Sequence, residues 1–202
     1  MKAEDARAYS SAGRLKSAAA NRKAVLEAAS RLLNEQANIT MEAVAAAAGV
    51  TRLTVYNQFG SRRGLLEAVF DEQALRGGIK ELAHVAEVAD PLAGLDQMID
   101  ILCRFWGGYP VIAALQDAAV GDMELKQALD SRQSRRREVI DALLSKMNGK
   151  KAQRKEAGDL LYVLVSLPTF RGLAKGRTPR QVADLLKRIS KATLGAEGLA
   201  PR

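Results

Sequence analysis

The stretch ITMEAVAAAAGVTRLTVYNQF, residues 39–59, contains two short helix patterns in immediate succession. Thr40 is placed to cap the first helix, because a threonine oxygen can accept a hydrogen bond from a free amide of the first turn. Gly49 then supplies the left-handed residue that commonly ends a helix. The same signals repeat at once, with Thr51 as the second cap. Two helices of about eight residues joined at a glycine predict a helix-turn-helix.

Helical patterns continue on both sides of this stretch. Upstream, apolar residues recur at helical spacing within residues 18–34, which predicts a first helix. Residues 1–17 are polar and lack such spacing, so we expect a flexible basic arm there. Downstream, Ser61 is placed to cap a further helix, which we expect to run to about Leu82 with a kink at Gly77–Gly78. The expected organisation is thus the arm, a helix-turn-helix domain at 18–63 and a C-terminal helical domain at 64–202.

The second helix of a helix-turn-helix enters the major groove of DNA, where its first residues meet base edges and phosphates. Hydroxyl, guanidinium and amide groups are the donors that such contacts require. The residues predicted to contact DNA are Thr40, Thr51, Arg52, Thr54, Tyr56, Asn57 and Arg62. The alternative is a plain helical hairpin in which these side chains are solvated caps.

A longer run favours the DNA-binding interpretation. RKAVLEAASRLLNEQANITMEAVAAAAGVTRLTVYNQFGSRRGLLEAVF, residues 22–70, resembles the DNA-binding domain of the TetR family of transcriptional regulators. The resemblance depends on the AAGV turn, the TVYNQF segment and the SRRGLLEAV opening of the next helix. Leu53 replaces the glycine or small residue common in the family, and Arg62 replaces its usual lysine. Leu53 could contact a thymine methyl group or pack away from DNA.

The charge distribution is consistent with a polyanionic partner. The 202 residues carry a net charge of +8 and have a pI near 9.8. Residues 1–63 contain 10 Lys and Arg against 5 Asp and Glu, so the basic excess is concentrated at the N-terminal end. Such a surface attracts nucleic acid or an anionic membrane. Its position favours DNA bound by the predicted helix-turn-helix.

Composition also narrows the class of protein. Hydrophobic residues make up 48% and charged residues 27%, and alternating β patterns are scarce, which predicts an all-α protein. Cys103 and His84 are the single residues of their types, so no internal disulfide or Cys/His zinc set is expected. The N-terminus lacks a signal-peptide pattern, and LLYVLVSLPTF is about half the length that spans a bilayer. We expect a cytoplasmic protein without a membrane partner.

The C-terminal region predicts a helical bundle. Helices are expected over about 91–106, 111–119, 121–147, 152–174 and from 178 onward, with Pro168 kinking the fourth. The segment DLLYVLVSLPTF is apolar on every side, so the last helix alone could hardly cover it. Pairing of the last two helices with a second copy would solve this, and the TetR resemblance also implies it. Leu164 and Leu186 are predicted at that interface. Arg135–Arg137 are interpreted as a solvated face.

An enzyme is not expected, because the sequence contains no nucleophile motif, P-loop or dinucleotide fingerprint. The TetR resemblance instead implies a small-molecule effector held in the C-terminal bundle. The candidate pocket residues are Phe105, Trp106, Tyr109, Tyr162 and Phe170, some of them around the helix break in CRFWGGYP. Taken singly, each of these aromatic residues is better explained as core filling. No ligand class, cofactor or metal is indicated.

Together these observations predict a homodimeric regulator, a repressor that binds a palindromic operator in double-stranded DNA. An unidentified small-molecule effector would release it. The helix that starts at Ser61 would connect the two activities. A constitutive or architectural DNA-binding protein would share the first 70 residues but have a filled core. A helical enzyme or interaction module without DNA affinity is the third possibility.

Overall fold

A computed structural model describes residues 2–36 and 38–201, and the side chains of these residues apart from 2–15 and 133. The described residues form eleven α-helices and one 3-10 turn without a strand, which confirms the expected all-α class. They divide into two compact units. The first unit comprises the residues up to Glu72 together with Ala114–Leu125. The second comprises Gln73–Ala113 and the residues from Lys126 onward.

Two capped helices form the centre of the first unit. The unit contains α1 (Lys2–Glu35), α2 (Met41–Ala48), α3 (Arg52–Phe59) and most of α4 (Arg62–Arg76). The Thr40 hydroxyl accepts a hydrogen bond from the Ala43 amide at 3.1 Å and so caps α2. Gly49, with φ of 67°, ends α2, and its conformation favours glycine. Thr51 caps α3 in the same manner, so the predicted helix-turn-helix is confirmed.

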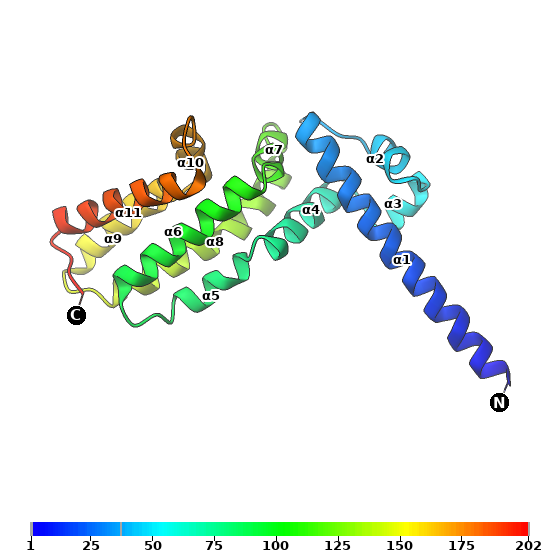
Figure 1. The fold of residues 1–202 in the computed structure, drawn as a ribbon, viewed down its shortest axis with the longest axis horizontal. Helices are drawn as coiled ribbons and strands as arrows, with labels where there is room; N and C mark the ends of the chain where they lie inside the picture. The colour runs from blue at the N-terminus through cyan, green and yellow to red at the C-terminus, as the bar shows by residue number, and fades with distance from the viewer. Residues whose placement is uncertain (1, 37, 202) are drawn as a thin grey trace. The chain divides into compact units, whose positions relative to one another are not determined.

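The N-terminal residues differ from the expectation. Helix α1 begins at Lys2, whereas we expected a first helix from about residue 18 behind a flexible arm (Figure 1). Alanine, lysine and arginine recur in this stretch and are strong helix formers, which favours a longer helix. The expected arm carries the basic residues Arg7, Arg14 and Lys16. Met1 and the side chains of Arg7 and Arg14 lie outside the described part. Lys16 is exposed.

Helix α1 packs on both helices of the pair. The guanidinium of Arg22 lies 4.7 Å from the centre of the Phe59 ring, and Gln58 donates a hydrogen bond to the Ala18 carbonyl at 3.4 Å. The core of the unit is built from small and branched apolar side chains, all nearly or fully buried: Val25, Ala29, Leu33, Ile39, Val44, Val55, Leu65, Leu66, Val69, Leu115 and Leu125. This core fixes the direction in which α3 presents its outer surface.

The second unit is a helical bundle. Its elements are the 3-10 turn Ile79–Glu81, α5 (Leu82–Val85), α6 (Pro91–Gly108), the start of α7 (Val111–Ala118), most of α8 (Met123–Ser145), α9 (Lys151–Leu164), α10 (Leu167–Leu173) and α11 (Pro179–Ala196). Helices α6, α8, α9 and α11 run side by side (Figure 1). Ion pairs join α11 to α6, between Lys187 and Asp100 and between Lys191 and Asp96. The bundle is therefore held by buried apolar contacts with charged pairs at its edge.

Two helix boundaries differ from the sequence prediction. We expected α4 to run through Gly77–Gly78 with a kink, but it ends at Arg76, and Gly78 adopts a left-handed φ of 72°. We also expected one kinked helix over 152–174. The chain instead leaves the helical conformation at Val165, and the Ser166 hydroxyl caps α10. Within the described residues no single helix has the length and apolarity of a membrane span, although α6 and α7 pass that test together across a bend.

Candidate functional site

Helix α3 presents most of its side chains outward. Val55 is the buried residue of this helix, whereas Arg52, Leu53, Tyr56 and Asn57 are exposed. The cap residue Thr51 lies beside them and pairs with the Thr54 hydroxyl at 2.9 Å. A helix with one inward side chain and a donor-rich outer surface is suited to the major groove. Helix α3 therefore has the geometry of a reading helix.

Arg52 is held in place by two neighbours. It forms an ion pair with Glu42 of α2, and it donates a hydrogen bond to the Tyr56 hydroxyl at 3.4 Å. Its guanidinium lies 5.2 Å from the centre of the Tyr56 ring. The Tyr56 hydrogen bond, followed by the Glu42 charge, raises the pKa of Arg52, so the side chain is a permanent cation. Exposed ion pairs contribute little stability, so Arg52 can exchange Glu42 for a guanine edge or a phosphate.

Arg62 is engaged within the first unit. Its Nε donates to the Ile39 carbonyl at 3.0 Å, and its terminal nitrogens contact Asn38 at 3.1 Å and Asp122 at 3.6 Å. These contacts connect the start of α4 to the segment before α2 and to the start of α8. The predicted phosphate contact of Arg62 stays a prediction, and it would require one of these partners to be exchanged.

Leu53 does not pack into the protein. The side chain is 67% exposed, in the first turn of α3 beside Arg52. The choice between contact with a thymine methyl group and packing away from DNA stays a prediction, and the exposed side chain is accessible for the first. An apolar group at this position can contact the methyl group of thymine.

These features define a class of protein: an all-helical chain whose helix-turn-helix exposes a donor-rich helix of the kind that enters the major groove of DNA. Residues 25–69 match the sequence family described as bacterial regulatory proteins, tetR family. Thr40, Thr51 and the exposed face of α3 all lie within the matched region. The helix-turn-helix part of the chain is thus similar to the DNA-binding region of that family.

Two curated relatives are named as HTH-type transcriptional regulators. The uncharacterized HTH-type transcriptional regulator Rv1255c of Mycobacterium tuberculosis is 34% identical over 92 residues, which are 45% of this chain and 46% of that protein. The chain thus spans about half the length of the curated relatives it matches. Its counterpart MT1294 from another strain of that species matches equally.

Solved structures extend the likeness to the whole fold. FadR from Bacillus subtilis, solved with stearoyl-CoA, superposes with a TM-score of 0.69 at 15% identity, over 83% of this chain and 96% of that chain. NalD of Pseudomonas aeruginosa, the secondary repressor of the MexAB-OprM efflux pump, gives 0.69 at 19% identity, over 88% and 96%. At these identities the likeness shows a shared fold.

The five candidate pocket aromatics lie in the second unit in three separate contacts. The rings of Phe105 and Tyr109 are 5.6 Å apart, and those of Trp106 and Phe170 are 5.7 Å apart. Tyr162 instead lies beneath the guanidinium of Arg136. Phe105, Trp106 and Phe170 are buried. Their role in a pocket stays a prediction, and none of them is among the residues that line three hollows in this unit.

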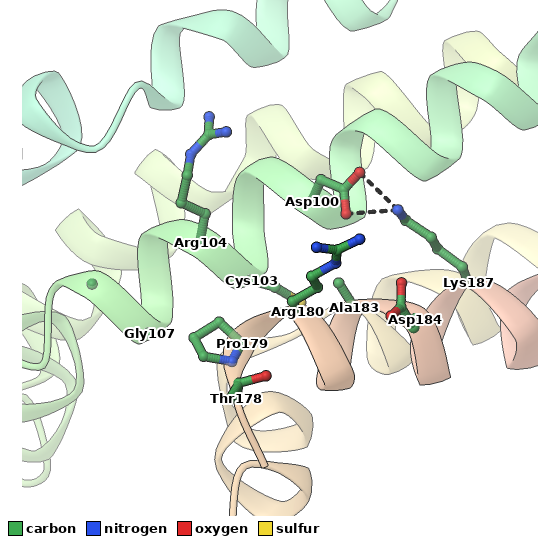
Figure 2. Close-up of a pocket in the computed structure, with 11 residues that line it drawn as sticks. Asp100, Cys103, Arg104, Gly107, Thr178, Pro179, Arg180, Ala183, Asp184 and Lys187 are labelled. Atoms are coloured by element: carbon green, nitrogen blue, oxygen red, sulfur yellow. Dashed lines mark hydrogen bonds and ion pairs between the residues drawn. The ribbon is translucent and has the colours of Figure 1, made fainter.

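The largest of those hollows is an open groove of about 800 Å³ between α6 and the first turns of α11 (Figure 2). Asp100 and Lys187 form an ion pair across it, with an oxygen-to-nitrogen distance of 2.6 Å. Arg180 projects into the same space (Figure 2). The mixture of paired charges in an open groove favours solvent over an apolar ligand.

The buried thiol of Cys103 lies in an environment that disfavours reactivity. Burial, followed by the charge of Asp100, raises the pKa of the Cys103 thiol to about 12, so the thiol stays protonated near neutral pH. Among the described residues, no group of three or more His, Cys, Asp and Glu side chains could hold a metal ion.

The dimer residues need a correction. Leu186 is fully buried within one chain, so it cannot form the surface that meets a second copy. Leu164 is half-buried. On the same stripe of α9, Leu160 is 45% exposed and Val163 is 65% exposed. Sequence reasoning recognised that this segment is apolar all round, but the side left uncovered depends on how α9 packs against α11.

Proposed function

We propose that the protein is a homodimeric transcriptional repressor that binds a palindromic operator through α3 and is released from it by a small molecule. The observation that carries the proposal is the exposed, donor-rich surface of α3, held by two capped helices. A two-fold dimer presents two such helices to successive major grooves, which explains why its operator would be an inverted repeat. The exposed apolar residues of α9 supply a surface for that dimer.

Release by the effector would require a coupling free energy between effector binding and operator binding. Such coupling free energies are typically about 1–3 kcal/mol. The effector would favour a form of the second unit in which the spacing of the two α3 helices does not fit the groove. Helices α4 and α8 each contribute residues to both units, so a change in the second unit has a covalent route to the first. Operator binding must then weaken effector affinity by the same factor.

The role of the exposed α3 surface is tested by replacing Arg52 or Tyr56 with alanine. Both side chains lie outside the core, so the fold should survive. Loss of a bidentate contact to guanine should weaken operator binding by roughly 5- to 150-fold for Arg52→Ala and relax selectivity at one base pair. Tyr56→Ala should weaken binding less, because Tyr56 orients Arg52. Fluorescence anisotropy on an upstream duplex checks both, and unchanged affinity for both variants would show that α3 is not the reader.

A second prediction concerns Leu53. If its exposed side chain contacts a thymine methyl group, replacing that thymine by deoxyuridine should weaken binding of the wild-type chain by several-fold. The same replacement should leave the affinity of Leu53→Ala unchanged, because that variant lacks the apolar contact. A double-mutant cycle over protein and DNA measures the coupling directly. Additive losses at every thymine of the half-site would remove Leu53 from base recognition.

The constitutive DNA-binding protein remains the second candidate, because Phe105, Trp106 and Phe170 are buried as core side chains are. Titrating candidate metabolites into the protein–operator complex distinguishes the effector-responsive repressor from the constitutive protein. Release of DNA by one compound, together with weaker binding of that compound to the operator complex, supports the repressor. No release by any metabolite of the neighbouring genes' pathway supports the constitutive protein.

A further inference from the structure

Arg136 occupies a core position in the second unit. It lies on the buried stripe of α8 with Leu129 and Ile140, and only 6% of the residue is exposed. Its neighbours Arg135 and Arg137 are exposed and half-buried, respectively. The expectation that Arg135–Arg137 form one solvated face is therefore wrong for Arg136. The sequence contained a signal for this burial. Arg136 follows Leu129 by seven residues and precedes Ile140 by four, and residues at these spacings share one side of a helix.

Arg136 lies over an aromatic ring rather than beside a described carboxylate. Its guanidinium lies 4.3 Å from the centre of the Tyr162 ring of α9, and its buried Nε has no hydrogen-bond acceptor. In the part of the chain that the structure describes, no carboxylate pairs with it. The nearby carboxylates of Asp141 and Asp159 instead pair with Arg137. The guanidinium thus interacts with Tyr162, and no described carboxylate neutralises its charge.

This arrangement is costly for a purely structural side chain. A guanidinium stays charged in proteins, and burying it without a hydrogen-bonded anion is strongly unfavourable. Burial lowers the pKa of Arg136, while the interaction with Tyr162 opposes the shift. An apolar side chain such as methionine would fill the same stripe without that cost. The position is better explained if the guanidinium gains an anion in another state of the protein.

We propose that Arg136 binds the carboxylate of an amphiphilic organic acid inside the second unit, and that this acid is the effector. The planar guanidinium fork matches a carboxylate in two parallel hydrogen bonds. Apolar side chains dominate the rest of the stripe, so the body of the ligand must be apolar as well. Tyr162 is only half-buried and covers one face of the guanidinium, which places the site near an edge of the bundle. The inference rests on the proposed effector release, whose ligand it assigns to a chemical class.

The test compares Arg136→Met with Arg135→Met, which removes the same charge one residue earlier from an exposed position. Calorimetric titrations use benzoate, octanoate and decanoate, each paired with its neutral alcohol. The wild-type chain and Arg135→Met should bind at least one acid at least tenfold more tightly than its alcohol. Arg136→Met should lose that preference. No preference for any acid in the wild type, or an equal preference in Arg136→Met, overturns the proposal.

Urea unfolding supplies a readout that does not depend on the ligand. Arg136→Met should raise the urea midpoint of the free protein, because it removes an uncompensated buried charge while keeping a long side chain. A lower midpoint would show that Arg136 is structural and would overturn the proposal. DNA release is measured separately with the same acids. An acid that binds through Arg136 without releasing DNA would leave this site intact and contradict effector release.

Discussion

Leu186→Glu is expected to unfold the second unit, whereas Val163→Glu is expected to leave it folded and to separate the dimer. Leu186 is fully buried within a single chain, so a glutamate there places an unpaired carboxylate in the core, at a cost of several kcal/mol. Val163 is 65% exposed, so a glutamate there stays solvated in the monomer. In a dimer joined through α9 and α11 it would be buried twice about the two-fold axis.

Light scattering and circular dichroism distinguish the two outcomes. Val163→Glu should keep the helical signal of the wild-type chain while its dimer dissociation constant rises by on the order of 100-fold. It should also lose operator affinity, because two linked half-site contacts become single ones. Val120→Glu is the matched control, because Val120 is 84% exposed and belongs to the first unit. A Val163→Glu dimer as stable as that of Val120→Glu would place the interface elsewhere.

Gly64→Ala is expected to disrupt the first unit. A methyl group built on Gly64 would lie 2.1 Å from the carbonyl oxygen of Phe59, the last residue of α3. That oxygen belongs to the backbone, and the turn around it is fixed by hydrogen bonds from Gly64 to the Ser61 hydroxyl and from Leu65 to the Ser61 carbonyl. Relief of the clash must therefore shift α3 against α4. We expect a loss of about 3 kcal/mol, at the upper end of overpacking costs, and loss of DNA binding.

Gly195→Ala supplies the contrast for Gly64→Ala. Gly195 lies in α11, and a methyl group there meets no atom within 4 Å. Alanine favours helix over glycine by about 1 kcal/mol, so this variant should be equal to the wild type or more stable. Urea midpoints measure both substitutions. If Gly64→Ala gains stability as Gly195→Ala does, the close packing of α3 against α4 is wrong.

The helix-turn-helix could be predicted from sequence because its determinants are local. Thr40 and Thr51 cap helices within three residues of their own position, and Gly49 fixes one backbone angle. Short-range signals of this kind need no knowledge of the rest of the chain. The exposed side of α3 followed from the same pattern, since Val55 is its inward residue.

The second unit was predicted less well because its features depend on contacts between distant segments. The burial of Leu186 and the exposure of Val163 are decided by the packing of α11 against α6 and α9. The burial of Arg136 was not predicted, because three adjacent arginines in the sequence suggest a solvated helix surface. The break at Val165 also needed the structure, because Pro168 lies three residues downstream of the point where the helical conformation ends.

Selection of bound duplexes from a random DNA library tests the central claim most directly. The wild-type chain should enrich an inverted repeat with half-sites about one helical turn, or a multiple of it, apart. Arg52→Ala should enrich the same repeat with selectivity lost at one base pair in each half-site. If the wild type enriches no sequence, or if Arg52→Ala enriches an identical one, α3 does not read DNA and the account is contradicted.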